Sequence, residues 1–256
     1  MKKRCVLPLI AAVIGIALSG SAFADTVTLT VGPDTKPDEN LPRTVFESPG
    51  SWMGDSSWQN STSNKVNWHA RYDADGDFLS KLFGAKAATL TIGDVSSISY
   101  FTNRGTELTA GRDWWVQIYT RPGSGGFNEK SWYGTRFINN YDEHTNTDWQ
   151  QHSTDYGMTF QHQNNSNSPS GPEMTMADMR ANYGNVLIEM ISIQTDSGWN
   201  GSDFLMDGLE ITLTDGSVGR VNFSHIAGYS VVVPTPSAAL GGLMLMGLPL
   251  LRRRQA

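Results

Sequence analysis

Cysteine is nearly absent from this chain, since its single Cys5 lies in the N-terminal apolar segment. The remainder of the chain therefore has no thiol. This excludes a disulfide framework, a thiolate zinc site and a cysteine nucleophile there. Cys5 precedes the apolar run instead of following it, which does not suit lipid attachment.

Basic residues are scarce between the two ends of the chain. Of 19 Lys and Arg residues, six lie in the ends, which leaves 13 against 25 acidic residues, a net charge of about −12 for the central part. An acidic body repels phosphate backbones, so no nucleic-acid partner is expected. The same charge suits solubility outside the cell or association with divalent cations.

Motifs of the common hydrolases are missing as well. The chain contains neither the Glu-x-Asp-x-x-Glu strand of laminarinase-like sandwich enzymes nor a Gly-x-Ser-x-Gly elbow. Glu189 and Glu210 fall on expected strands, yet each sits alone in the sequence. The loop Gly123-Ser124-Gly125-Gly126 lacks the spacing of a phosphate-binding loop. No catalytic residues are predicted.

Residues 1–24 have the pattern of a secretory signal peptide. Lys2, Lys3 and Arg4 precede an apolar stretch from Val6 to Leu18, and Ala22-Phe23-Ala24 forms a small-x-small cleavage site. Cleavage between Ala24 and Asp25 is predicted. The alternative is an N-terminal membrane helix, which the shortness of the stretch disfavours.

The C-terminus, residues 233–256, combines a proline pair, a short apolar run and a basic cluster. Val233-Pro234-Thr235-Pro236-Ser237 leads into Ala238 to Leu251, followed by Arg252, Arg253 and Arg254. The run is 14 residues long and reaches about 21 Å as a helix, short of a ~30 Å hydrocarbon core. Terminal arginines favour a cytoplasmic C-terminus, which would leave the rest of the chain outside.

Together these features resemble the bacterial PEP-CTERM sorting signal. The resemblance implies recognition by a membrane exosortase and transfer of the protein to the cell surface or the extracellular polysaccharide. Thr235 stands where glutamate is usual in that motif. An ordinary weak membrane anchor is the alternative, and both interpretations place the protein outside the cell.

Residues 25–232 predict a single all-β domain, a β-sandwich or jelly roll of roughly eight to eleven short strands. Period-2 alternation and β-branched or aromatic runs carry this prediction. The expected strands are Thr26–Val31, Val66–Tyr72, Thr89–Ile92, Ile98–Thr102, Trp114–Thr120, Val186–Thr195, Asp207–Thr214 and Val218–Phe223.

Turns and helices follow from the residues between these strands. Gly93-Asp94 is expected to join two strands as a turn, and Asp215-Gly216-Ser217 to close a hairpin. Met176–Tyr183 is the one expected helix, stopped by Gly184, and Asp77–Phe83 suits a single helical turn.

The segment 142–172 is crowded with Asn, Gln, Ser, Thr and His, and predicts a long polar surface loop. Trp114 and Trp115 are consecutive, so one of them is expected at the surface or at a bulge. The block from Val186 to Phe223 resembles the closing region of exported sandwich domains that carry this tail. That likeness supports the fold and implies no chemistry.

Asp73, Asp75 and Asp77 alternate in a short loop and could converge on calcium, which prefers oxygen ligands. The EF-hand spacing is not met, since glycine is fourth in the loop and the twelfth residue is Gly84. A polar turn without metal is therefore the alternative. Calcium is the only cofactor that the sequence suggests.

Eight tryptophans invite a carbohydrate-binding interpretation. Trp132 and Trp149 lie in or beside the polar segment, where their rings could stack on sugars while amides bind the hydroxyls. The alternative is that these rings fill the core. His144, His152 and His162 lack the spacing of a zinc site, and are expected to be solvated.

The expected function is that of a non-catalytic cell-surface or matrix protein, sorted by an exosortase and associated with extracellular polysaccharide. The alternative is a secreted carbohydrate-active enzyme with unrecognised catalytic carboxylates. Expected partners are the sorting enzyme, the membrane at the C-terminal helix, and polysaccharide.

Overall fold

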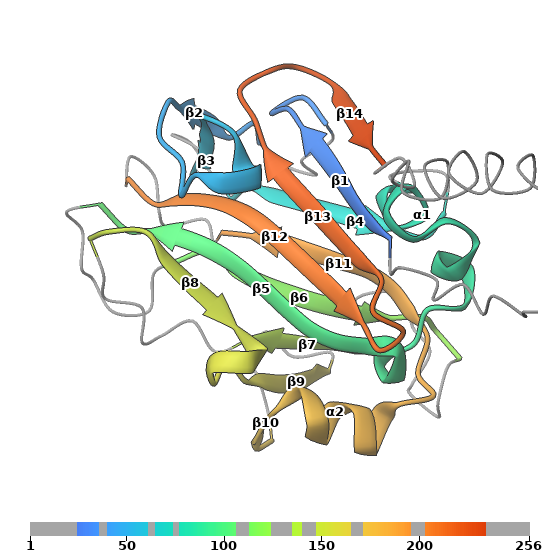
Figure 1. Cartoon of the computed structure of the whole chain (residues 1–256). Coiled ribbons are helices and arrows are strands. Elements are labelled where there is room, and N and C mark those ends of the chain that lie inside the picture. The colour runs from blue at the N-terminus through green and yellow to red at the C-terminus, as the bar shows by residue number, and fades with distance from the viewer. Residues whose placement is uncertain are drawn as a thin grey trace, which may run out of the picture.

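The computed structural model describes residues 25–35, 40–60, 65–73, 77–105, 113–123, 135–139, 147–164, 171–195 and 203–233. Within them the chain is an all-β sandwich with two sheets and short helical segments (Figure 1). The fold class expected from the sequence is thereby confirmed. The described residues form 14 strands, more than the eight to eleven predicted, because several short edge strands carry little apolar periodicity.

The first sheet has eight strands. They are β1 (Thr26–Val31), β2 (Arg43–Val45), β3 (Ser57–Gln59), β5 (Val95–Asn103), β8 (Gln150–Ser153), β12 (Leu205–Leu213), β13 (Val218–Phe223) and β14 (Tyr229–Val232). Strand β12 lies at the centre, with β13 and β3 along one edge and β5 along the other, and β5 in turn pairs with β8. Only the β1–β13 pairing among these is parallel.

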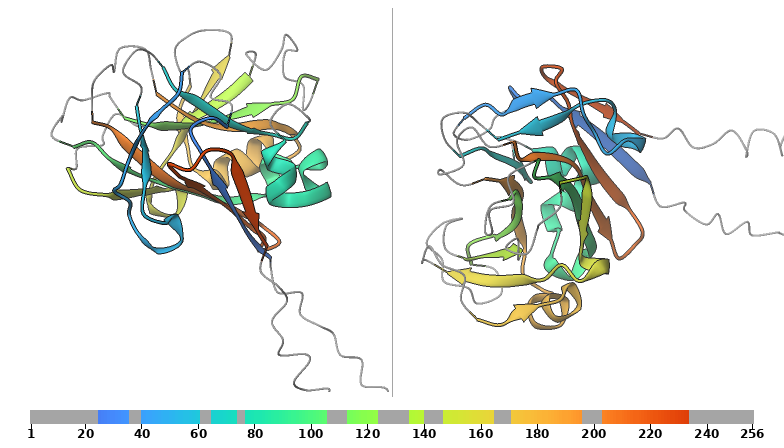
Figure 2. Two further views of the ribbon diagram at one scale, coloured as in Figure 1. Left: turned by 90° about the horizontal axis from the view of Figure 1, so that it is seen from above. Right: turned by 90° about the vertical axis from the view of Figure 1, so that its left-hand side faces the viewer.

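The second sheet has six strands in the order β10-β9-β7-β6-β11-β4. They are β4 (Asn67–Arg71), β6 (Trp115–Thr120), β7 (Thr135–Asn139), β9 (Phe160–Asn164), β10 (Glu173–Met174) and β11 (Ile188–Gln194). All of its pairings are antiparallel. The two sheets stack as layers in the side view of Figure 2.

The core lies between the sheets and is rich in aromatic rings. Trp68 of the second sheet packs edge-on against Phe223 of the first, with ring centroids 5.2 Å apart, and Trp58 packs against the same ring at 4.8 Å. Phe78 stacks on Trp68 from helix α1 (Phe78–Phe83). These contacts explain why much of the tryptophan content is structural, since edge-to-face ring pairs stabilise a core beyond their buried area.

Helix α2 (Met176–Tyr183) has the predicted bounds. Thr175 and Asp178 form a reciprocal capping box at its N-terminus, which satisfies two backbone donors that the helix cannot pair itself. Its buried Met176 and Met179 face the sandwich, and Arg180 donates to the carbonyl oxygens of Val95 and Ser96. Short 3-10 segments complete the fold: η1 (Ser51–Met53), η2 (Gly84–Thr89), η3 (Ile92–Asp94) and η4 (Thr154–Tyr156).

Two hairpin predictions have different outcomes. The Asp215-Gly216-Ser217 turn joins β12 and β13 as predicted, and Gly216 has the positive φ of 90° that such a turn favours. The Thr89–Ile92 strand was wrong. That segment belongs to η2, a single bridge at Thr91 and η3, because the Asp94 carboxylate caps the Thr91 backbone and closes a helical turn.

The predicted polar loop at 142–172 was also wrong over its central part. Strands β8 and β9 lie within it, and Phe160 is fully buried. These strands contain buried polar side chains such as His152 and Gln163, so their sequences lack the alternation of apolar residues that predicts a strand. Residues 142–146 and 165–170 lie outside the described residues.

Both rings of the tryptophan pair Trp114 and Trp115 are buried, so neither occupies the surface position that was one of the two predicted possibilities. Trp114 precedes the strand and its indole N–H donates to the carbonyl of Phe204 at 2.8 Å. Trp115 shares a face of the second sheet with its register partner Gln194, opposite to the face of Val116. Its ring is nevertheless only 5 % exposed.

Candidate functional site

The carboxylates of the predicted calcium loop are paired with cations. Asp73 accepts two hydrogen bonds from Arg71, at 2.9 and 3.2 Å, and Asp77 forms an i,i+4 ion pair with Lys81. Asp75 lies outside the described residues. Among the residues that the structure describes, no group of three His, Cys, Asp or Glu could hold a metal ion. The calcium site stays a prediction.

The predicted sugar-stacking tryptophans are not brought together in the described part of the chain. Trp149 is half-buried just before β8, in the first sheet, and Trp132 lies outside the described residues. The expectation of solvated histidines was wrong for His152, which is buried. His162 is half-buried in β9, and burial lowers its pKa.

Of the predicted sorting and cleavage residues, the structure describes Asp25 and Val233. Ala24, Pro234, Thr235, Pro236, Arg252, Arg253 and Arg254 lie outside the described residues. Within the described ranges, no helix has the length and apolar character needed to cross a membrane.

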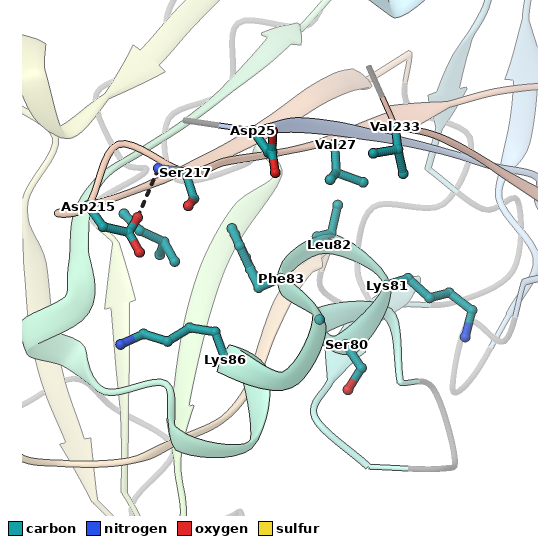
Figure 3. Close-up of a pocket in the computed structure, with 12 residues that line it drawn as sticks. Asp25, Val27, Ser80, Lys81, Leu82, Phe83, Lys86, Asp215, Ser217 and Val233 are labelled. Atoms are coloured by element: carbon teal, nitrogen blue, oxygen red, sulfur yellow. Dashed lines mark hydrogen bonds between the residues drawn. The ribbon is translucent and has the colours of Figure 1, made fainter. Parts of the chain in front are cut away.

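Asp25 and Val233 both line an open pocket of about 350 Å³ beside α1 (Figure 3). Lys86 on its wall is paired with Asp94 at 2.7 Å. Asp215 accepts a hydrogen bond from the Ser217 backbone, which lowers its pKa. The first and last described residues of the domain thus line the same pocket.

A buried polar network joins the sheets at one end of the core. Thr102 Oγ1 donates to Asp113 Oδ2 at 2.8 Å and lies 2.8 Å from His152 Nε2. Asp113 also accepts the Trp114 backbone N–H. The hydroxyl thus sits between acid and imidazole, whereas a nucleophilic triad needs the imidazole in the middle. The described order of these groups is therefore not that of such a triad. Burial and the Asp113 charge raise the pKa of the adjoining Tyr100 phenol well above its usual value.

Among the described residues, the outer face of the second sheet carries an unusual polar surface. Six side chains from its three neighbouring strands β4, β11 and β6 form what we call the polar floor: Asn67, His69, Trp115, Gln117, Ser192 and Gln194. Their neighbours in sequence, such as Trp68, Val116 and Ile193, point into the core. The floor follows from strand alternation, which sends successive side chains to opposite faces.

Strand register arranges the floor as two rows of three. Gln194 pairs with Asn67 on one side and Trp115 on the other. Ser192 likewise pairs with His69 and Gln117. At strand spacings of about 4.8 Å the floor is roughly 10 Å wide, and the rows are about 7 Å apart.

The floor is buried although it faces away from the core. Each of its six residues is between 0 and 6 % exposed. Polar side chains on an outer sheet face are normally solvated, so the burial of these six is unusual. A covered polar surface of this kind needs partners for its hydrogen-bonding atoms.

Four oxygen atoms of the floor have no hydrogen-bond partner within the part of the chain that the structure describes. They are Asn67 Oδ1, Gln117 Oε1, Ser192 Oγ and Gln194 Oε1. Each belongs to a buried side chain. An unpaired buried polar atom costs about 1–3 kcal/mol, so four of them on one small patch are a substantial destabilisation.

A charged margin borders the floor at the next row of β4 and β11. Arg71 donates to Glu189 Oε1 at 3.1 Å as well as to Asp73. Burial raises the pKa of Glu189 and the Asp73 charge adds to this, while Arg71 opposes them. Glu189, which stands alone in the sequence, is bridged to Asp73 through the guanidinium of Arg71.

The sequence contained a signal for the floor that the strand predictions did not use. Residues Asn67, His69, Gln117, Ser192 and Gln194 all occupy alternate, core-opposite positions of predicted strands. Such residues ordinarily indicate a solvated face, so the pattern alone did not mark a site. Their burial distinguishes them from an ordinary solvated face.

Comparisons of this chain with protein-family models, with curated proteins and with solved structures find no match. Functional assignment therefore depends on the residues of the chain itself.

Proposed function

We propose that this chain is an exported, non-catalytic protein of the cell surface or extracellular matrix that associates with polysaccharide. On this proposal, residues 1–24 direct export, a jelly-roll-like domain spans 25–232, and residues 233–256 sort the protein through an exosortase-type enzyme and the membrane. The single observation that carries the binding role is the polar floor, a buried surface of amide, hydroxyl, imidazole and indole groups.

The position of the two ends of the described domain supports attachment at one side. Asp25 and Val233 line the same pocket, next to α1 (Figure 3). A domain whose two ends leave together can be held by either one without strain across the sandwich. The floor lies on the second sheet, whereas both ends belong to strands of the first sheet. A tether at that sheet would leave the second sheet free of the attachment.

The engagement of the described carboxylates supports a binding role over hydrolysis. Glu210 pairs with Arg220 at 2.7 Å, Glu189 with Arg71, and Asp113 with Thr102. A glycosidase needs two carboxyl groups held on either side of a sugar bond. Glu189, with its raised pKa, is the residue to test for the alternative of a carbohydrate-active enzyme.

Retention on polysaccharide tests the proposal. The full chain, purified in detergent, is passed over immobilised neutral polysaccharides and over uncoated support. We expect retention by at least one glycan and no release of reducing sugar. Sugar release that is lost in Glu189→Gln would establish the enzyme instead. Trp149→Ala and Gln117→Leu compare the predicted tryptophan platform with the polar floor.

The sorting route has a separate test in the intact mass of the protein recovered from cells. We expect an N-terminus at Asp25 and recovery in the envelope or extracellular fraction. A full-length, unprocessed chain in the cytosolic extract would contradict export.

A further inference from the structure

We infer that strand β14 (Tyr229–Val232), with Val233 directly after it, is a pairing surface for a second copy of this chain. Two β14 strands would join antiparallel across a two-fold axis at Val231, so that the first sheets of the two copies continue into one another. Such a dimer follows neither from export nor from polysaccharide association, and it gives a use to an edge of the first sheet.

Strand β14 lies open at the end of the first sheet. It ends the strand order beyond β1, and within the described residues it pairs with β1 alone (Figure 1). All four of its residues are exposed, and Val233 is 57 % exposed. A sheet edge of this kind presents unpaired backbone N–H and C=O groups, to which another strand can be added.

The direction of these backbone groups follows from the register of β1 and β14. In an antiparallel ladder, opposite residues alternate between pairs that exchange hydrogen bonds and pairs that do not. The Gly32 N–H donates to the Gly228 carbonyl at 2.7 Å, so the residues of β14 that are bonded to β1 are Ser230 and Val232. The residues that alternate with them direct their backbone N–H and C=O groups to the open edge: Tyr229, Val231 and Val233.

The three outward residues form a symmetric set about Val231. An antiparallel second copy can therefore place Val231 opposite Val231, and Tyr229 opposite Val233. In that register all three positions are hydrogen-bonded pairs, each of which exchanges two backbone bonds. A two-fold interface requires such self-complementarity, because the same surface serves both subunits. The register also brings a valine pair and two aromatic–β-branched pairs together, which are combinations that stabilise a sheet.

Charge does not oppose this pairing. The strand and Val233 carry no acidic or basic side chain, although acidic residues are in excess in the central part of the chain. Lys81 lies 5.1 Å from the ring centroid of Tyr229 and is ion-paired with Asp77. Two copies can therefore approach at β14 without placing like charges of the strand directly opposite each other.

Two other strand edges of the described domain are guarded against pairing. Strand β2, at the opposite end of the first sheet, has three residues, one of them Arg43, and it follows Pro42. Strand β10, at one end of the second sheet, has two residues, including the exposed Glu173. Short length, charge and proline are common protections of an edge strand. Neither charge nor proline is present in β14, which suits a strand whose edge is used.

Sedimentation equilibrium of the full chain, in a density-matched detergent, measures the association. A pairing of five residues per copy is a small interface, so we expect a reversible dimer whose population rises with protein concentration. Val231→Pro removes the central outward N–H from each copy and leaves the hydrogen bonds to β1 in place, since proline is tolerated at an edge where the N–H faces solvent. We expect the dissociation constant of its dimer to rise about tenfold or more.

Val231→Lys and Thr44→Lys form a matched pair of variants. Val231→Lys places two like charges opposite each other at the two-fold axis, and should also weaken the dimer. Thr44 is exposed on β2 at the other edge of the same sheet, so Thr44→Lys adds the same charge and should dimerise as the parent does. The melting temperature in dilute solution separates lost pairing from lost folding.

A covalent test uses the low cysteine content of the chain. In a Cys5→Ser background, Val231→Cys introduces the only thiol of each copy. Hydrogen-bonded antiparallel pairs have Cα atoms about 5.5 Å apart, within the range that a disulfide spans. We expect oxidation to give a disulfide-linked dimer for Val231→Cys and none for Thr44→Cys in the same background.

Three results would overturn the inference. The first is a parent chain that stays monomeric at every protein concentration. The second is a dimer that Val231→Pro and Val231→Lys leave at parental strength, which would assign the association to another part of the chain, such as its apolar ends. The third is a Val231→Cys chain that forms no more disulfide than Thr44→Cys, which would mean that β14 is covered by another segment or another partner.

Discussion

Ser192→Ala should stabilise the unliganded protein. The Ser192 hydroxyl is fully buried and has no partner in the described residues, so it carries a desolvation cost of about 1–3 kcal/mol. Its removal leaves a cavity the size of one oxygen atom, which costs about 0.3–0.5 kcal/mol at about 24 cal/mol per Å³. The net gain is about 1 kcal/mol, or a rise of about 2–4 °C in melting temperature for a domain of this size.

A matched serine provides the control. Ser56 is also buried, but its Oγ accepts the backbone N–H of His225 at 3.2 Å and lies 3.0 Å from the His225 ring nitrogen. Ser56→Ala removes the same atom from a paired site and should cost about 1–2 kcal/mol, because the backbone donor is left unsatisfied. The two substitutions are thus identical in chemistry and opposite in expected sign.

The assay is thermal and chemical unfolding of both variants without added sugar. A lower melting temperature for Ser192→Ala, comparable to that of Ser56→Ala, would show that the hydroxyl is paired, and would refute the claim that the floor is unsatisfied. No change at all would indicate an ordered water in its place, which makes about three hydrogen bonds in such sites.

Three further predictions concern other parts of the chain. Burial raises the pKa of the Asp207 carboxyl well above 3.8, although the hydrogen bonds that it accepts from two backbone N–H groups oppose this shift. The folded protein therefore favours the protonated carboxyl, and its stability falls as the pH rises through the raised pKa. The Asp207→Asn variant should therefore lose less stability toward neutral pH. Its free energy of unfolding there should exceed that of the parent by about 1.4 kcal/mol per unit of pKa shift; equal pH dependence of stability in variant and parent would contradict this. Gly208→Ala should lower the melting temperature by several degrees, because Gly208 has a φ of 70° and the added Cβ would lie 2.2 Å from a methionine sulfur; a melting temperature equal to that of the parent would refute that packing. The melting temperature should be the same with calcium as with a chelator, since Asp77 is already ion-paired. A melting temperature that calcium raises in the parent but not in Asp75→Asn would instead establish the predicted calcium loop.

Strand prediction worked where one face of a strand is apolar and the other is not. The strands over Thr26–Val31 and Val218–Phe223 were predicted at their observed bounds, and the helix at Met176–Tyr183 as well. These segments carry their period in the residue types themselves. Prediction failed at Thr89–Ile92, where a carboxylate cap competes with extension, and in the 142–172 segment, where buried strands are built from polar residues.

The candidate site shows the same division. Its residue types were visible as polar positions on predicted strands, but the recognisable motifs of the sequence lie at Asp73, Trp149 and their neighbours. Register between β4, β11 and β6 brings the floor residues side by side, although more than a hundred positions separate Asn67 from Gln194. Sequence spacing carries no information on such a long-range pairing.

By itself, the sequence determined the class of this protein: a cysteine-poor, acidic, all-β body between two apolar ends, because composition and local periodicity depend only on residues close together in the chain. The tertiary structure alone decided which polar side chains are solvated and which are enclosed. Burial is a property of everything that packs over a residue, and the floor is unusual only because amides and hydroxyls that local patterns assign to water are held away from it.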